Sequence, residues 1–217
     1  MNFQDIIDNA LIAEQAVKAT RIRSGKFSPS SFGRCYRMQY WNRKNEPQSN
    51  PVGVEALRRF KVGNIIHQYA QGFFPNAQKE VMINLPDVIG FADIVLDNEV
   101  IDIKSCRSFE FKTFANPNYD IKVGKFQNCL QVCAYAHFLG KPFARLIFIE
   151  KDALDSKEFV IETKDLAVEL KDELEILRGQ WANGVLPPAS PRAYGGKECS
   201  YCNYKDKCFV IENEGVK

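Results

Sequence analysis

Residues 90–104 have the sequence GFADIVLDNEVIDIK, in which two short apolar runs flank the pair Asp97-Asn98. Both residue types tolerate the positive φ of a tight two-residue turn, so this stretch predicts a β-hairpin. A regular hairpin closed at this turn places Asp93 directly opposite Asp102. Opposed carboxylates repel each other across a ladder. The pair therefore indicates a divalent cation held between two neighbouring strands.

Strand alternation predicts which side chains of the hairpin share a face. We expect one face to carry Asp93, Asp102 and Lys104, which places an ammonium group one pleat from a carboxylate. The opposite face is expected to be wholly apolar. Its members are Ala92, Ile94, Leu96, Ile101 and Ile103.

The whole chain has the composition of an ordinary globular protein. Its 217 residues suffice for one well-buried domain, and no apolar run approaches the length of a membrane span. Acidic residues interrupt the helical pattern of residues 1–19, which excludes a secretory signal and favours a cytoplasmic protein. Residues 1–61 carry 11 Lys and Arg against 5 Asp and Glu. This basic first quarter suits a phosphate-contacting surface and equally a solvated helix face.

Periodicity along the chain predicts a mixed α/β fold with a central sheet flanked by helices. Helices are expected over 1–19, from Ser28 to 41, and over 54–73, 126–138 and 166–181, and strands over 78–85, 90–104, 144–150 and 158–162. Residues 109–122 are expected to be irregular. We divide the single domain 1–217 into a helical basic front (1–73), an α/β core (74–185) and a cysteine-rich tail (186–217).

Three cysteines lie close together in the tail, as Cys199-x-x-Cys202 followed by Cys208. An odd total of seven cysteines and no export signal favour metal or cluster ligation over disulfides. A bound group would replace the core that so short a tail cannot build. A four-thiolate site needs one more ligand, and Cys35 is the candidate. Zinc and an iron–sulfur cluster both accept such a set.

The order of these motifs resembles a known enzyme family. Gly-x-x-Asp at 90–93 followed by Asp-x-Lys at 102–104 resembles the core of the PD-(D/E)xK nuclease superfamily. Gly-x-x-x-His at 63–67 and Gln-x-x-x-Tyr at 131–135 resemble its RecB-like branch. The cysteine spacing resembles the iron–sulfur staple of the AddB nuclease domain and, most closely, of the CRISPR-associated exonuclease of spacer acquisition. The resemblance spans residues 28–208.

This resemblance implies roles for the hairpin residues and for His67. His67, Asp93, Asp102 and the main-chain carbonyl of Ile103 are expected to hold Mg²⁺ or Mn²⁺. Lys104 is expected to orient or help deprotonate the attacking water, and its charge offsets the charge of the phosphorane.

The resemblance also assigns the helix pair and the cysteines. Gln131 and Tyr135 are expected to contact DNA or to brace the residues that hold the metal. The four cysteines are expected to hold a 4Fe–4S cluster, with zinc as the less favoured alternative. They are Cys35, Cys199, Cys202 and Cys208.

Several other residues receive weaker predictions. A surface position at the strand end is favoured for Glu80, with the alternative that it helps the site, as an acidic residue near this point does in some relatives. A structural role is favoured for His137. Cys106, Cys129 and Cys133 are also expected to be structural. Candidates for guiding a DNA strand are Arg34, Arg37, Arg58, Arg59 and Lys61.

The expected function is a metal-dependent DNA exonuclease that prefers single-stranded ends and leaves 5′-phosphate and 3′-hydroxyl products. One alternative is a non-catalytic or dormant DNA-binding accessory subunit of a recombination or CRISPR-adaptation complex. A redox-sensing iron–sulfur regulator is a weaker alternative, because such a protein needs no paired carboxylates. The chain has no helicase region, so an integrase, helicase or recombination protein is compatible as a partner, as is a homo-oligomer. No membrane association is expected.

Overall fold

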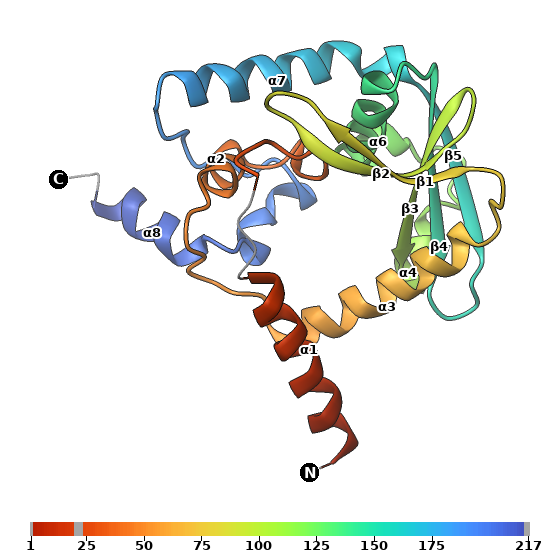
Figure 1. The fold of residues 1–217 in the computed structure, drawn as a ribbon, viewed down its shortest axis with the longest axis horizontal. Helices are drawn as coiled ribbons and strands as arrows, with labels where there is room; N and C mark the ends of the chain where they lie inside the picture. Colours follow the sequence, from red (N-terminus) through yellow and green to blue (C-terminus); the bar gives the residue numbers. More distant parts are fainter. Residues whose placement is uncertain (1, 20–23, 215–217) are drawn as a thin grey trace.

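The computed structural model describes residues 2–19 and 24–214, and its centre is a five-stranded sheet (Figure 1). The strand order is β1-β2-β3-β4-β5; β3 and β4 run parallel, and the other neighbours are antiparallel. The strands are β1 (Gln78–Asn84), β2 (Ile89–Val95), β3 (Glu99–Cys106), β4 (Phe143–Glu150) and β5 (Ser156–Glu162). The predicted mixed sheet is therefore confirmed.

Some helices pack against this sheet, and the others lie in the N-terminal and C-terminal parts of the chain. They are α1 (Phe3–Ala19), α2 (Tyr36–Lys44), α3 (Val54–Gln71), α4 (Ser108–Thr113), α5 (Ile121–Gly124), α6 (Phe126–Phe138), α7 (Ala167–Ala182) and α8 (Lys205–Glu214). Short 3₁₀ turns are η1 (Pro29–Ser31), η2 (Thr163–Leu166), η3 (Tyr194–Gly196) and η4 (Glu198–Tyr201). Every helix in the described residues is too short or too polar to span a bilayer.

The predicted hairpin is formed by β2 and β3. Ile94 pairs with Ile101, which is the register that a turn at 97–98 requires. Neither turn residue has a positive φ, so the turn is of a different type from the one expected. The ladder ends after this pair, whereas β3 continues beside β4 as far as Cys106. In Figure 1 the β1–β2 ribbon turns away from β3, so the two strands diverge beyond this pair. We call the place where they part the opening between β2 and β3.

Two hydrophobic cores lie on the two faces of the sheet. The larger core contains the buried side of α6 and of α7, together with Val100 and Leu146. The smaller core places Ile66 and Ala70 of α3 against Ile101. Because α3 and α6 approach opposite faces, any side chain in the opening between β2 and β3 can be reached from both helices.

A phase shift at Asp93 changes the predicted hairpin faces. Ala92 lies in the α6-side core, whereas Ile94 lies in the α3-side core. Regular alternation would place both on one face, so the prediction for Ala92 is wrong. On β1, Glu80 has a φ of +51°, which is uncommon for a residue with a Cβ. Distorted strands of this kind re-aim side chains in the way that β-bulges do.

The helical front differs from the prediction in where α2 begins. The start signal at Ser28 leads only into the short turn η1, and α2 begins at Tyr36. Gly33 explains the delay: its φ of +74° is incompatible with a helix, and a Cβ there would lie 3.2 Å from the Cα of Gln127 on α6. Residues 109–122 contain α4 and α5, which are too short to show helical periodicity.

Candidate active site

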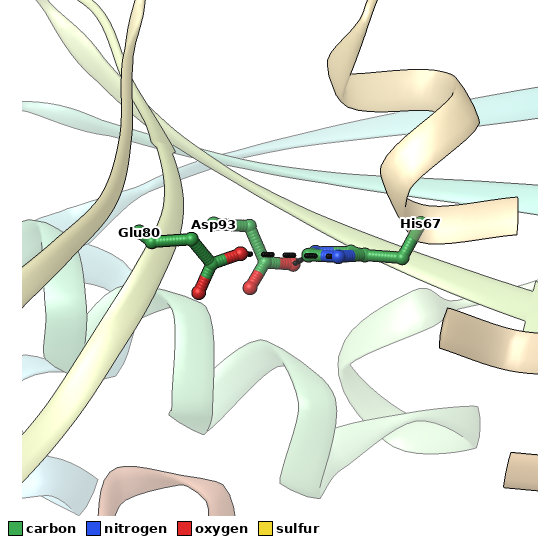
Figure 2. A group of neighbouring side chains, drawn as sticks. All are labelled: His67, Glu80 and Asp93. Carbon is green, nitrogen blue, oxygen red and sulfur yellow. Dashed lines mark ion pairs between the residues drawn. The ribbon is translucent and has the colours of Figure 1, made fainter. Parts of the chain in front are cut away.

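Three potential metal ligands converge at the opening between β2 and β3 (Figure 2). His67 of α3, Glu80 of β1 and Asp93 of β2 place ligand atoms within 4.8 Å of one another. The Nε2 atom of His67 lies 2.8 Å from Asp93 Oδ2, and its Nδ1 atom lies 3.9 Å from Glu80 Oε1. An imidazole and two carboxylates form a donor set that suits Mn²⁺ and, less well, Mg²⁺.

Gln71 and Ile103 hold these carboxylates in place. Gln71 lies one helical turn after His67; its side-chain amide donates to Glu80 Oε1 at 2.7 Å and to the main-chain carbonyl of Asp93 at 3.1 Å. The main-chain N–H of Ile103 donates to Asp93 Oδ2 at 2.9 Å. In an antiparallel pair, the N–H and C=O of one residue point to the same neighbour. The carbonyl of Ile103 therefore faces the same opening as Asp93.

Asp102 and Lys104 occupy the α6 side of the opening. The carboxylate of Asp102 is fully buried; its Oδ1 accepts from the amide of Gln131 at 3.0 Å, and its Oδ2 lies 2.7 Å from Lys104 Nζ. The Lys104 ammonium is thus a cation already in contact with this buried oxygen, and the ion pair offsets part of the free-energy cost of burying the carboxylate.

Burial and charge set the protonation of this site. Burial raises the pKa of Asp102, the Asp93 charge raises it further, and Lys104 opposes both effects. Burial disfavours the charged form of Lys104, but attraction to Asp102 leaves the lysine pKa above its ordinary value. The hydrogen bond to Asp93 raises the pKa of His67. Lys104 is therefore an ammonium at neutral pH, and a metal would compete with a proton for His67.

Tyr135 stands behind Gln131 and is only 3% exposed. Burial raises its pKa, and its hydroxyl interacts with the Gln131 side chain and the main chain of Phe91. Gly90 makes this approach possible, because a Cβ there would lie 2.8 Å from Tyr135 Cε1 and 3.0 Å from its hydroxyl oxygen. So deeply buried a ring can brace Gln131 and has little surface for DNA.

The predicted ligands reach one opening but lie on its two sides. His67 and Asp93 meet as the sequence predicts, whereas Asp102 lies outside the three-residue group. The two aspartates do not form a ladder pair, because β2 and β3 separate at this level. The residues still fit a divalent cation, since the imidazole and two carboxylates converge on one side, with the buried Asp102 carboxylate and its Lys104 partner on the other.

Two residues have a larger part in the site than the sequence favours. The Glu80 side chain is 54% exposed, as the favoured surface position predicts, yet its carboxylate belongs to the candidate metal group, in line with the alternative that the resemblance offers. The outcome depends on the backbone of β1, where Glu80 has a positive φ. Gln71 belongs to no predicted motif, although its spacing of four residues after His67 places both on one face of α3.

The four cysteines predicted to act together lie around one small core. Its buried centre is Met38, Trp41 and Tyr204. Cys35, Cys202 and Cys208 border this core, Cys199 lies in η4, and all four are free thiols. Such an arrangement brings the front and the tail of the chain to the same place, as a shared ligand set requires.

Hydrogen bonds reach two of these sulfurs. The guanidinium of Arg37 donates to Cys208 Sγ at 3.3 Å, and the main-chain N–H of Tyr204 donates to Cys202 Sγ at 3.4 Å. Donors of this kind stabilise negative charge on a thiolate. These donors favour a thiolate at Cys202 and Cys208, whereas burial raises the pKa of the Cys199 and Cys202 thiols, so a bound metal or cluster would have to displace their protons.

The basic residues of the front are largely paired. Arg34 pairs with Glu198, Arg37 with Glu212, Arg58 with Asp8, and Lys61 with Glu14. Arg37 is also 6% exposed, so its predicted contact with a DNA strand is wrong. Arg59 is exposed. Residues 21 and 23, two further arginines of the basic quarter, lie outside the described residues.

The remaining cysteines and His137 stand apart from the site. Cys129 and Cys133 are buried in the α6-side core, and burial raises the pKa of each thiol to about 12. Burial likewise raises the pKa of Cys106 to about 11. His137 is exposed and contacts the ring of Phe138. These thiols are protonated at neutral pH, which suits packing and not ligation.

Comparison with solved structures finds proteins that are similar to this chain. The solved structure of SSO0001 has a TM-score of 0.56 and 18% identity, covering 93% of this chain and 93% of that chain. The structure of LHK-Exo in complex with dAMP has a TM-score of 0.54 and 14% identity, covering 74% of this chain and 89% of that chain. A second LHK-Exo structure, an alkaline exonuclease from Laribacter hongkongensis, has a TM-score of 0.47 and 14% identity, with 74% and 95% covered.

At such identities the similarity is one of fold. None of the curated proteins is similar enough in sequence to count as a relative. The sequence does match the family described as the PD-(D/E)XK nuclease superfamily over residues 6–209, which is nearly the whole chain. This chain belongs to the PD-(D/E)XK nuclease superfamily.

Proposed function

We propose that this nuclease is a divalent-cation-dependent DNA exonuclease of the RecB-like branch that acts on single-stranded or free DNA ends. The observation that carries the proposal is the opening between β2 and β3. Its α3 side gathers His67, Glu80 and Asp93, and its α6 side presents the buried Asp102 and the ammonium of Lys104. A phosphodiester in this opening would have a cation site on one side and a fixed positive charge on the other.

The residues of the opening divide the chemistry between them. A divalent cation supplies Lewis acidity, which polarises a phosphate oxygen and acidifies water. His67, Glu80 and Asp93 would hold it, with Asp102 and the carbonyl of Ile103 facing the same opening. Lys104 would orient the attacking water and offset the charge that develops on the phosphate.

Gln131 supports this arrangement from α6. Its amide nitrogen binds Asp102 at 3.0 Å, and its amide oxygen lies 3.3 Å from Lys104 Nζ. One side chain therefore sets the relative position of the carboxylate and the ammonium. Hydrolysis with this geometry would leave 5′-phosphate and 3′-hydroxyl ends, as the resemblance implies.

For the cysteine region we propose a 4Fe–4S cluster held by Cys35, Cys199, Cys202 and Cys208. The family resemblance supports this choice over zinc, because four thiolates accept either group on ligand type alone.

The biological setting is proposed on resemblance. The CRISPR-associated exonuclease of spacer acquisition is the favoured relative, with an integrase, helicase or recombination protein as partner and self-association compatible with the fold. LHK-Exo, which was solved with dAMP bound, supports DNA as the substrate. The division into front, core and tail stays a prediction.

Cleavage of end-labelled single-stranded DNA by the purified protein in Mg²⁺ or Mn²⁺ tests the proposal. Lys104→Ala and Asp102→Ala should each lower the rate roughly a hundred- to a thousand-fold or more, because each removes a charge preorganised at the reacting phosphate. Lys164→Ala is the matched control, since that lysine is 77% exposed and pairs only with Glu162 among the described residues. Wild-type rates in either active-site variant would contradict the proposal. Binding without any cleavage by the wild-type protein would favour an accessory subunit.

A further inference from the structure

Two exposed tyrosines and an arginine form an unusual surface group in the cysteine-rich region. The rings of Tyr194 and Tyr201 meet edge to face, with centroids 5.9 Å apart and an interplanar angle of 73°. Their exposed fractions are 49% and 70%. The guanidinium of Arg34 lies over the Tyr194 ring, 5.8 Å from its centroid. Exposed aromatic faces next to a cation are the materials of a surface that stacks bases and attracts phosphate.

This group is connected to the active site through α6. Arg34 follows Gly33, which approaches the main chain of Gln127 so closely that a Cβ would lie 3.2 Å from its Cα. Gln127 precedes Gln131 by one helical turn, and Gln131 contacts both Asp102 and Lys104. The segment that carries Arg34, with the Tyr194 ring next to the guanidinium, therefore lies close to the first turn of α6.

The surface is held in place by a buried carboxylate. Glu198 is 2% exposed; it accepts from Arg34 Nε at 3.1 Å, from the Cys35 main chain at 3.0 Å and from the Arg192 main chain at 3.0 Å. Tyr194 has a φ of +56°, in the left-handed region that costs free energy for a residue with a Cβ. Tyr194 therefore has an unusual backbone conformation directly after Arg192 and Ala193, whose main chains are bound to Glu198.

We propose that Tyr194, Tyr201 and Arg34 form a stacking surface for the unpaired bases of a single DNA strand whose phosphodiester lies in the active-site opening. The inference rests on the proposed nuclease function and deepens it by naming the residues that would bind the unpaired bases. A duplex turns its bases inward, so only an unpaired strand presents faces for the two rings. Because every base has a π face, the surface would tolerate any sequence. The cysteine region would thereby contribute directly to substrate choice.

Binding to two oligonucleotides of equal length tests the proposal. One is fluorescein-labelled oligo-dT, and the other has the same backbone with abasic sites in place of the bases. Measurements use the full chain with Lys104→Ala, so that the DNA stays intact. We expect Tyr194→Ala with Tyr201→Ala to weaken oligo-dT binding roughly ten-fold or more, as the loss of base stacking does, and to leave the abasic strand unaffected. Tyr→Phe at both positions should bind as the parent does, because the rings remain.

Phe209→Ala is the matched control, since that ring is 69% exposed on α8. Unchanged oligo-dT binding in the double alanine variant would overturn the inference, as would equal weakening for both strands. If the alanine variants fail to fold, the parent protein alone still tests the inference. Equal affinity of the parent for oligo-dT and for the abasic strand would overturn the proposal that bases stack on the protein. Metal-dependent cleavage by the wild-type protein is scored separately, so failure of the nuclease proposal is distinguishable from failure of this one.

Discussion

Asp93 shows how one side chain can serve both the fold and the chemistry. Its Oδ2 accepts from the Ile103 main chain at 2.9 Å and lies 2.8 Å from His67 Nε2. The carboxylate therefore satisfies an N–H that the ladder leaves unpaired when β2 and β3 separate. The same placement turns Asp93 toward α3 and brings it to Glu80. Asp93, which lies beyond the end of the β2–β3 ladder, is thereby held in place by its side chain.

Gly90 is the residue whose size limits the site. In Gly90→Ala the new methyl would lie 2.8 Å from Tyr135 Cε1 and 3.1 Å from Pro29 Cδ. Because Tyr135 is buried and cannot swing away freely, we expect the free energy of unfolding to fall by about 1–3 kcal/mol. DNA cleavage should also fall, since Tyr135 braces Gln131. Urea unfolding and the cleavage assay measure the two effects.

The matched control for that variant is Gly179→Ala in α7. A Cβ at this helical glycine would meet no atom within 4 Å. Alanine is the better helix former, so stability should stay equal or rise by about 0.5–1 kcal/mol. If the Gly90→Ala protein is as stable and active as this control, the Tyr135 ring moves aside without cost and the prediction is wrong.

At the scale of elements, the turn between β4 and β5 is organised by a single carboxylate. Glu150 is buried and accepts from the main chains of Asp152 and Ala153, at 2.9 Å and 2.6 Å. The Ser108 hydroxyl donates to it at 2.5 Å, which ties the start of α4 to the same turn. One acidic group thus joins the end of β4 to α4, the first element of the crossover from β3 to β4.

The stability of this turn should depend on pH. Main-chain donors, that of Ala153 first, lower the pKa of Glu150 from 4.5 to about 2. The folded state therefore favours the charged form; this contribution is fully present above pH 4.5 and is lost as pH falls toward 2. We expect Glu150→Gln to be less stable than the wild type at pH 7. The difference in free energy of unfolding should shrink as the pH is lowered through that window.

Urea unfolding between pH 7 and pH 3 measures the difference. Glu175→Gln is the control. This glutamate on α7 is 62% exposed, and its carboxylate lies as far as 3.7 Å from its partner, the ammonium of Lys171. Its effect should be small at every pH. A stability gap for Glu150→Gln that stays constant down to pH 3 would count against a lowered pKa.

At the scale of the whole molecule, two buried glutamates join the cysteine region to the α/β core. Glu173 of α7 accepts from Gln39 at 2.8 Å and from Arg192 at 2.7 Å. Glu198 accepts from Arg34 and from the main chain of Cys35. The segment that carries Cys35 is thus held between α7 and the tail by charged hydrogen bonds. The region that holds the cysteines and the exposed tyrosines is positioned by this network.

Glu198→Gln should loosen this connection. The amide cannot pair with Arg34 as a carboxylate does, and breaking a buried ion pair by changing one partner costs about 3–5 kcal/mol. We expect a lower free energy of unfolding and fewer iron or zinc atoms per chain after purification, because Cys35 loses its main-chain anchor. Unfolding curves and elemental analysis measure both.

The exposed Glu169 of α7 provides the comparison. Glu169→Gln should keep wild-type stability and metal content. Full metal content in Glu198→Gln would show that the cysteines find one another without the glutamate.

Local patterns by themselves determined the parts of this protein that depend on neighbours in the chain. The alternation of residues 90–104 and the turn at 97–98 predicted the hairpin and its register, which Ile94 and Ile101 confirm. The motif spacing predicted the nuclease superfamily, which the match over residues 6–209 confirms. The hairpin register and the motif spacing depend on short-range geometry and on residue types, and a single sequence contains both.

Only the tertiary structure decided where the site residues point. Glu80 joins the candidate metal group where β1 has an irregular backbone, and Asp93 parts from Asp102 because β3 leaves β2 to follow β4. Arg37 turns inward to Cys208 because the tail folds back onto α2. Each outcome depends on contacts between segments far apart in the chain, where packing and charge pairing override the local pattern.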